Sequence, residues 1–382
     1  MTKNIIKVLS SSVVAQFLTM LVTLVIIRSL SLHEFADYSF YLGLSAIVSG
    51  FLANVINRYI VFSDTYNIVR FSYRWVYLIS AILFFVFLNN KQIIIISILI
   101  SLHMVIFEVN RTYYQKKQDF TKYGVSQVFK SIAFLFFIIL LFFMEQLTTE
   151  SSLSSIALSL LLANVIFLPS VNRKEISLFG MMKGVFINNA YLSLYFIIIP
   201  IMSQSSQWFL RFGVSVEEQG YFSLAFYIYT ISMLMVASMK KVFISELANK
   251  SYTECINGIK KVTWKITAIA AFFSLLTFLI LPYIGFIINK DVENVKWPLF
   301  ILLSSSVFSI LLSPYSEVLQ KHLKYKDLFY SGLLALSTMF LLGFILKFLD
   351  KGSAVSFSMI YLISYFVLNY SIYMRSKLCT HY

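Results

Sequence analysis

The first long apolar run of the chain, Val8–Ile27 (VLSSSVVAQFLTMLVTLVII), contains no charged side chain. A helix of about 20 mainly apolar residues is long enough to cross the hydrocarbon core of a bilayer. Lys3 and Lys7 precede the run, as basic residues do in a secretory signal peptide, but no small-residue cleavage site follows it. The run therefore predicts a first membrane-spanning helix that the protein retains.

Similar apolar runs recur along the whole chain, in which 59% of the 382 residues are hydrophobic and 13% are charged. Soluble domains carry about 25% charged residues, so lipid must cover much of this chain's apolar surface. The pattern predicts an all-α integral membrane protein with about twelve transmembrane helices. We place them at about 8–28, 38–60, 72–89, 92–112, 125–144, 151–170, 185–208, 219–241, 264–288, 297–316, 327–347 and 353–374, and the short third one could be tilted or partly interfacial.

The basic residues support this count, because they alternate between the loops. With the amino terminus inside, 24 of the 31 lysines and arginines lie on the inner side, and every inner loop holds more than its outer neighbours. Loops inside the cell carry this excess in multi-pass membrane proteins. The distribution predicts that both termini lie in the cytoplasm, and it accounts for the net charge of +14 without a nucleic-acid partner.

Several kinds of enzyme are disfavoured. The outer loops are short, about 10 residues, and the longest loop, about 242–263, is expected inside the cell. An extracellular polymerase would need a larger outer loop for its chemistry. Nucleotide-binding glycine loops and H-E-x-x-H motifs are absent, and the two cysteines have no metal-ligand spacing. We therefore expect no enzyme, cofactor or metal site.

Two predicted outer loops share the spacing Arg-x5-Glu-x3-Tyr at a constant separation of 183 residues. They contain Arg28, Glu34 and Tyr38, and Arg211, Glu217 and Tyr221. A weaker echo links Gln115-Lys116 with Gln320-Lys321. Because six helices separate the two outer loops, both halves have one orientation, which is a parallel repeat. We predict two six-helix bundles, at 1–170 and 185–382, with a cytoplasmic linker at 171–184, the usual construction of a rocking transporter.

The residues of these loops resemble a known family. The run Ile27–Tyr38 (IRSLSLHEFADY) is similar to the "aRlLgpeeFGlYs" pattern of Wzx-type polysaccharide flippases, and the stretch Arg211–Tyr221 to "R..l..f.s.eevGyYs". The helix that leaves through Glu108 and Arg111 also has the family's character. These flippases form the polysaccharide transport family of the multidrug/oligosaccharidyl-lipid/polysaccharide superfamily. In one departure, Ala36 stands where the family has glycine.

The resemblance implies a flippase that moves a lipid-diphosphate-linked oligosaccharide across the inner membrane by alternating access. Its partner would be an undecaprenyl-diphosphate-linked oligosaccharide destined for O-antigen, capsule or exopolysaccharide. The resemblance also allows an association with polysaccharide assembly proteins. Two alternatives stay open: a multidrug exporter of the same superfamily and, from another class, a membrane polysaccharide polymerase or acyltransferase.

A diphosphate needs cationic donors, and arginine binds two phosphate oxygens at once through its planar fork. Charged groups at membrane depth are costly and often mark transport pathways. Each candidate could also be a topogenic or snorkelling residue. Our candidates for substrate binding are Arg28, Asn54, Asn57, Arg58, Arg111 and Arg211, with Lys130, Lys240 and Lys241 as further cations. Asn54, Asn57 and Arg58 share one helical face by their i, i+3, i+4 spacing.

Two further groups in the fourth helix could couple transport to protons. His103 and Glu108 are titratable side chains within an apolar segment. Glu108 could instead pair with Arg111 three residues later and act as a structural clamp. We favour the clamp. Pro200, Pro282 and Pro314 are expected to interrupt helices of the second half.

Overall fold

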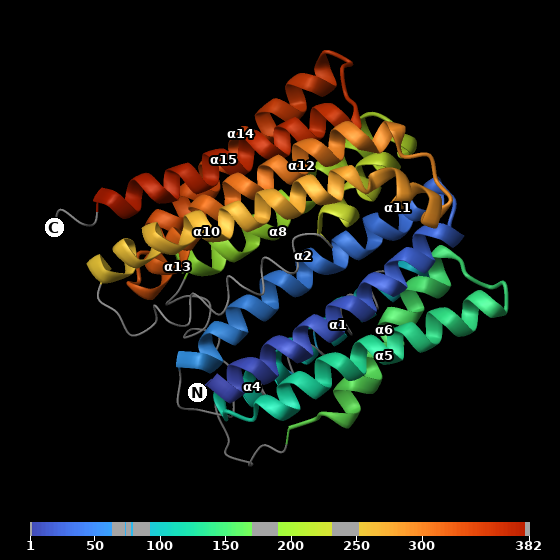
Figure 1. Cartoon of the computed structure of the whole chain (residues 1–382), viewed down its shortest axis with the longest axis horizontal. Helices are drawn as coiled ribbons and strands as arrows, with labels where there is room; N and C mark the ends of the chain where they lie inside the picture. Colours follow the sequence, from blue (N-terminus) through green and yellow to red (C-terminus); the bar gives the residue numbers. More distant parts are fainter. Residues whose placement is uncertain are drawn as a thin grey trace. The chain divides into compact units, whose positions relative to one another are not determined.

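The computed structural model describes residues 2–62, 73, 78, 92–169, 190–230 and 252–378, and this part contains helices, turns and loops but no strand. By its internal contacts the chain divides into two compact units, Met1–Pro200 and Ile201–Tyr382, which we call unit 1 and unit 2. The helices (Figure 1) are α1 Thr2–Ser29, α2 Leu32–Phe62, α4 Gln92–Lys116, α5 Phe120–Phe143, α6 Thr149–Ile166, α8 Ala190–Gly213, α10 Tyr252–Leu279, α11 Leu281–Ile288, α12 Glu293–Leu312, α13 Pro314–Lys321, α14 Tyr325–Phe348 and α15 Ala354–Leu378.

Nine of the helices in the described ranges are long and apolar enough to cross a membrane. The predicted all-helical, multi-span class is confirmed for these segments. The predicted third helix, 72–89, lies outside the described residues except for Tyr73 and Leu78, which are both helical. Residues 216–230 are helical and form the start of the predicted eighth helix.

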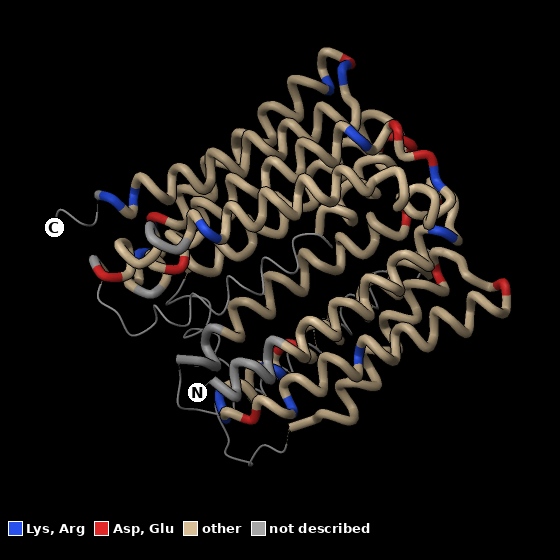
Figure 2. Tube along the Cα trace, in the orientation of Figure 1, with Lys and Arg blue, Asp and Glu red and all other residues tan. Residues whose placement is uncertain are grey.

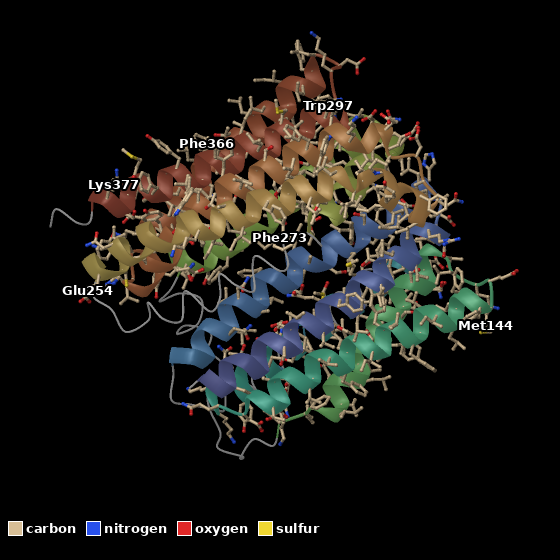
Figure 3. The ribbon with its side chains drawn as sticks, viewed as in Figure 1. Met144, Glu254, Phe273, Trp297, Phe366 and Lys377 are labelled. Carbon is tan, nitrogen blue, oxygen red and sulfur yellow. The ribbon has the colours of Figure 1, made fainter. Side chains whose placement is uncertain are left out.

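In both units many small polar side chains are buried and many large apolar side chains are exposed, the reverse of the distribution in a soluble protein. Buried positions include many serines, such as Ser152 in α6 and Ser358 in α15, which are both completely buried. Large apolar side chains point outward: Phe366 and Trp297 (Figure 3) are 42% and 60% exposed. Charged residues gather mainly at the helix ends (Figure 2). Small residues between helices and apolar residues outside are the arrangement that lipid favours.

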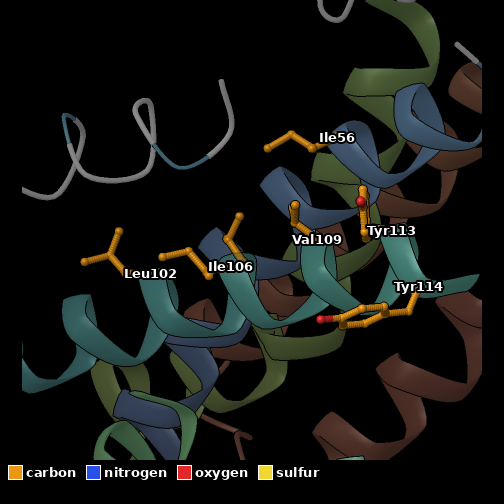
Figure 4. Close-up of a cluster of buried hydrophobic side chains, with 7 residues drawn as sticks. Ile56, Leu102, Ile106, Val109, Tyr113 and Tyr114 are labelled. Atoms are coloured by element: carbon orange, nitrogen blue, oxygen red, sulfur yellow. The ribbon is translucent and has the colours of Figure 1, made fainter. Parts of the chain in front are cut away.

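Unit 1 has a buried apolar core between α2 and α4 (Figure 4). Ile56 of α2 packs there against residues of α4 that follow helical spacing, Leu102, Val105, Ile106, Val109 and Tyr113. Residues at i, i+3, i+4 and i+7 share one face of a helix, so this face of α4 is committed to packing. The polar groups of α4 consequently lie on its other faces.

The two units repeat each other at the turns between their helices. Gln118 and Leu323 have φ of 58° and 59°, and Glu145 and Asp350 have φ of 57° and 53°. A left-handed backbone is uncommon outside glycine, so it is unusual to find it at matching turns of both units. Each pair is separated by 205 residues, which is also the separation of Gln115-Lys116 and Gln320-Lys321 in the weak sequence echo.

The caps of α6 and α15 repeat at the same separation. In α6, Thr148 N donates to Ser151 Oγ at 2.8 Å, and Ser151 N donates to Thr148 Oγ1 at 3.2 Å. In α15, Ser353 N and Ser356 Oγ are 2.8 Å apart, and Ser356 N and Ser353 Oγ are 3.2 Å apart. These reciprocal bonds satisfy amide groups that a helix start leaves open. The predicted pseudo-repeat is thereby confirmed in its turns and caps.

The outer-loop echo needs one correction. Glu34 and Ser31 cap the start of α2, with Ser31 N donating to Glu34 Oε2 at 2.8 Å. In unit 2, Ser215 occupies the equivalent position before the helix, and Glu218 N donates to its Oγ at 3.1 Å. Glu218, not Glu217, is therefore the equivalent of Glu34. The equivalent separation is therefore 184, not 183, because the second loop is one residue longer. Glu217 instead accepts a hydrogen bond from Tyr221 at 3.1 Å.

The predicted ninth and tenth helices differ most from the structure. α10 begins at Tyr252, so half of the predicted polar loop 242–263 is helix. Its buried face, Cys255, Ile256, Ile259 and Thr263, follows helical spacing that overall polarity obscures. Each predicted helix is also two pieces: α11 begins at Leu281 with Pro282, and α13 begins at Pro314. Pro200, in contrast, lies inside the continuous helix α8.

The division between the units falls within α8, between Pro200 and Ile201. The predicted linker, 171–184, lies outside the described residues. The predicted lobes, 1–170 and 185–382, stay a prediction.

Candidate functional site

A group of charged and polar side chains within the described spans joins α4 to α5 in unit 1. It consists of Phe107, Glu108 and Arg111 of α4 and Tyr123, Gln127 and Lys130 of α5, and we call it the α4–α5 cluster. On α5 the three polar residues are spaced i, i+4 and i+7, so they share one helix face. On α4, Phe107, Glu108 and Arg111 lie within one turn.

Arg111 is the centre of the cluster, and its side chain is 11% exposed. Nη1 donates to Glu108 Oε1 at 2.8 Å, and Nη2 donates to Tyr123 Oη at 2.7 Å and to Gln127 Oε1 at 2.9 Å. Its Cζ also lies 4.4 Å from the centroid of the Tyr123 ring. These contacts form the clamp that the sequence favoured, and they extend it from α4 to α5.

Lys130 is the second cation of the cluster, and its environment differs from that of Arg111. Its Nζ lies 5.4 Å from the centroid of the Phe107 ring, and the Cζ of Arg111 lies 5.7 Å from the same centroid. Lys130 makes no ion pair in the described part of the chain. The cluster thus contains two cations and one carboxylate, and the carboxylate is bound to Arg111.

A second polar connection in unit 1 links α4 to α6. Tyr73 donates to Asn110 Oδ1, Asn110 Nδ2 donates to Asn164 Oδ1 at 3.4 Å, and Asn164 Nδ2 donates to the carbonyl of His103 at 2.9 Å. The imidazole Nδ1 of His103 is buried without a hydrogen-bond partner among the described residues. His103 is thus connected to α6 through its backbone, not through its titratable ring.

The repeat provides an internal comparison for the α4–α5 cluster. At a separation of 205 residues, the polar positions of the cluster correspond to Ser313, Ser316, Leu328, Gly332 and Ala335. Helix α4 is continuous at Glu108, whereas α12 ends one residue before Ser313 and α13 begins one residue after it. Because unit 2 forms the same turns and caps without these charges, the lobe fold does not require the cluster.

The other predicted site residues belong to three different helices or lie outside the described residues. Arg28 lies exposed in the last turn of α1, and Arg211 lies in the last turn of α8, where Nη1 donates to the buried Gln219 at 3.3 Å. Asn54 of α2 is exposed, and Asn57 Oδ1 is buried without a hydrogen-bond partner among the described residues. The side chain of Arg58, and Lys240 and Lys241, lie outside the described residues.

Arg28 and Arg111 lie near opposite ends of unit 1. Thr19 of α1 and Ser131 of α5 approach to 3.3 Å, and these two helices run in one direction (Figure 1). From this contact α1 continues for nine residues to Arg28, whereas α5 runs back eight residues to Tyr123, the partner of Arg111. At 1.5 Å per residue the two arginines are separated by roughly 25 Å along the helices. Unit 1 therefore does not bring these two candidates together.

Sequence reasoning missed Tyr123 and Gln127 as partners of Arg111. Tyr123 lies before the start of the predicted fifth helix, at 125, whereas α5 begins at Phe120. The side chain of Asp119 accepts from the backbone of Lys122 at 3.1 Å and caps this start. An aspartate cap followed by a polar face at i, i+4 and i+7 is the signal that could have found the cluster.

Comparison with solved structures identifies the fold. The chain is similar over 99% of its length to a multidrug resistance MATE family transporter of the MOP superfamily, in an inward-facing conformation (TM-score 0.68, 13% identity, 98% of that chain) and an outward-facing one (0.64, 11%, 96%). It is also similar to a MOP superfamily transporter from Pyrococcus furiosus described by the reverse polarity of its binding pocket (0.63, 11%, 99% of this chain, 96% of that chain). No protein-family model and no curated protein matches the sequence. The chain therefore has the fold of these transporters.

Proposed function

We propose that the chain is a membrane transporter that works by alternating access and is not an enzyme. The observation that carries this proposal is the likeness over 99% of the chain to one transporter fold solved in both inward- and outward-facing conformations. A two-lobe build with a repeat suits the rocking motion that exposes one site to each side in turn. The 24 basic residues assigned to inner segments support cytoplasmic termini.

For the substrate we propose a lipid-diphosphate-linked oligosaccharide, moved to the outer leaflet of the bacterial inner membrane. The sequence resemblance to Wzx-type flippases at Ile27–Tyr38 and Arg211–Tyr221 supports it. The charge in the spans supports it as well. Beyond the first two turns of the nine described spans, Glu108 is the one carboxylate, and Arg111 already binds it. Lys130 leaves the α4–α5 cluster with an excess of one positive charge, which suits an anionic substrate.

A multidrug exporter is the second candidate, and the likeness in fold to multidrug resistance transporters favours it. Identities of 11–13% leave the substrate open, since one fold hosts sites of different chemistry. The Pyrococcus furiosus neighbour, for which reversed pocket polarity suggests a different function, illustrates this point. An exporter of cationic drugs would need an available carboxylate in its cavity, and among the described spans Glu108 is already paired.

Deletion of the gene in its native host distinguishes the two substrates. We expect lipid-linked oligosaccharide to accumulate on the cytoplasmic side of the membrane, measured by mass spectrometry of the extracted lipids, and surface polysaccharide to be lost. Restoring the chain should reverse both effects. Greater drug susceptibility with unchanged lipid-linked intermediates would instead support the multidrug exporter and contradict the flippase.

A further inference from the structure

An aromatic groove with a lysine at its end lies between α8 and α14 in unit 2. The groove has a volume of about 190 Å³. It is lined by Ser205, Trp208, Phe209, Phe212 and Gly213 of α8 and by Phe340, Phe344 and Lys347 of α14. Apart from Ser205 and the lysine ammonium, its lining is apolar, and neither the transport proposal nor the predicted site residues use it.

The groove has a direction. Gly343 lies against Phe209, and Gly213 lies against Lys347, so α8 and α14 run in the same direction along it. From Ser205 to Gly213 the groove follows α8 for about 12 Å, at 1.5 Å per residue. Lys347 lies at the end where both helices stop, so the cation lies at one end and the aromatic rings extend inward from it.

Two glycines create this space. A Cβ at Gly343 would lie 2.8 Å from Cε2 of Phe209, so the bare backbone allows the phenyl ring to lie against α14. A Cβ at Gly213 would lie 3.3 Å from Cδ of Lys347, so the lysine stem rests on α8 at the groove's end. In unit 1, at a separation of 205 residues, Ile138 replaces Gly343 and Phe142 replaces Lys347. The groove is thus a specialisation of unit 2.

We infer that this groove binds an anionic phospholipid, with one acyl chain along the aromatic rings and the phosphate at Lys347. The exposed rings, Phe212 at 69% and Phe344 at 58%, offer apolar surface to a lipid chain. Lys347 is exposed and makes no ion pair with any described residue, so its ammonium is available to a phosphate. An apolar groove that ends at a cation suits an anionic lipid better than a zwitterionic one, because a zwitterionic headgroup brings its own cation next to the phosphate. The inference holds for either substrate class.

Trp208 lines the groove and reports on its occupant. A variant that retains only this tryptophan (Trp75→Phe, Trp264→Phe, Trp297→Phe) would be reconstituted with brominated phosphatidylglycerol or brominated phosphatidylcholine, diluted in unbrominated lipid. A bromine atom in contact with the indole quenches its fluorescence. We expect half-maximal quenching at a fraction of brominated phosphatidylglycerol about fivefold lower than the fraction of brominated phosphatidylcholine that is needed. Fivefold is the gain in affinity that one lysine near an anionic lipid provides.

Three substitutions in this background test the assignment. Lys347→Gln should make the two quenching curves coincide, whereas Lys351→Gln, which removes a nearby exposed lysine outside the groove, should leave the preference intact. Gly343→Ala should displace the Phe209 ring and weaken quenching by both lipids. The inference is overturned if the unsubstituted groove shows no preference, or if Lys351→Gln removes it as fully as Lys347→Gln.

Discussion

Replacing Arg111 with alanine is expected to destabilise the protein by about 1–3 kcal/mol, the cost of leaving the partners of a buried hydrogen-bond donor unsatisfied. The ion pair adds less than a fully buried one would, because the Glu108 side chain is 41% exposed. Arg111 donates to Glu108, Tyr123 and Gln127, and its loss leaves three groups of α4 and α5 without their shared donor. Arg111→Lys should recover only part of the loss, because lysine lacks the planar fork. Thermal unfolding of the purified protein in detergent, followed by size-exclusion chromatography, measures the change.

The control for this substitution is Lys122→Ala, which removes an exposed pair on α5 in which Lys122 Nζ lies 3.9 Å from Asp119. Exposed pairs contribute about 0–1 kcal/mol, so little change is expected. If Arg111→Ala retains wild-type stability and membrane level but loses export, the clamp is contradicted and the expectation that Arg111 binds substrate is supported instead.

Replacing Lys130 with methionine is expected to abolish export without destabilising the protein. The ammonium of Lys130 makes no ion pair in the described part of the chain, and translocon scales place the cost of a mid-span lysine at about 2.5–3.5 kcal/mol. Methionine removes that cost, so thermal stability should stay constant or rise. Export should fall to the level of the deletion strain, because the cluster loses its excess positive charge. Surface polysaccharide in the complemented deletion strain measures export.

Two further variants decide whether the charge is what matters. Lys130→Arg keeps the cation and should retain most of the export. Lys265→Met removes an exposed lysine of α10 and should export normally. Normal export by Lys130→Met would contradict the account and make Lys130 a snorkelling residue. A fall in stability equal to that of Arg111→Ala would make Lys130 a structural residue.

Hydrophobicity alone predicted most of the fold, because a bilayer requires long apolar helices. Departures occur where local packing overrides mean hydropathy. Residues 252–263 read as a polar loop, yet Ile256 and Ile259 form the buried face of a helix. The breaks before Pro282 and Pro314 follow from the missing amide of proline, but Pro200 shows that proline does not always end a helix.

The candidate site was predictable only in part. The pair Glu108–Arg111 follows from a spacing of three residues on one helix, and the structure contains it. The bonds from Arg111 to Tyr123 and Gln127 depend on how α5 packs against α4, which spacing along the chain does not reveal. Substrate binding by Arg28, Asn54, Asn57, Arg58, Arg111 and Arg211, and coupling by Glu108 and His103, stay predictions.

The repeat shows where the two lobes have specialised. Turns with positive φ and serine caps recur at one separation, since they form the fold. At a separation of 205 residues, uncharged residues replace the charges of the α4–α5 cluster in unit 2, and Ile138 and Phe142 replace Gly343 and Lys347 in unit 1. Residues that differ between equivalent positions of a repeat are the places where function can be sought.

Translocation by the purified protein in proteoliposomes tests the central claim most directly. A lipid diphosphate carries roughly two negative charges, so a potential negative on the loaded side assists its exit by about 4–5 kcal/mol per 100 mV if both charges cross the whole field. We predict that a lipid-diphosphate oligosaccharide, loaded in one leaflet, reaches the other only with the protein present, and faster when the loaded side is negative. Translocation no faster than in protein-free vesicles, at either polarity, would contradict the account.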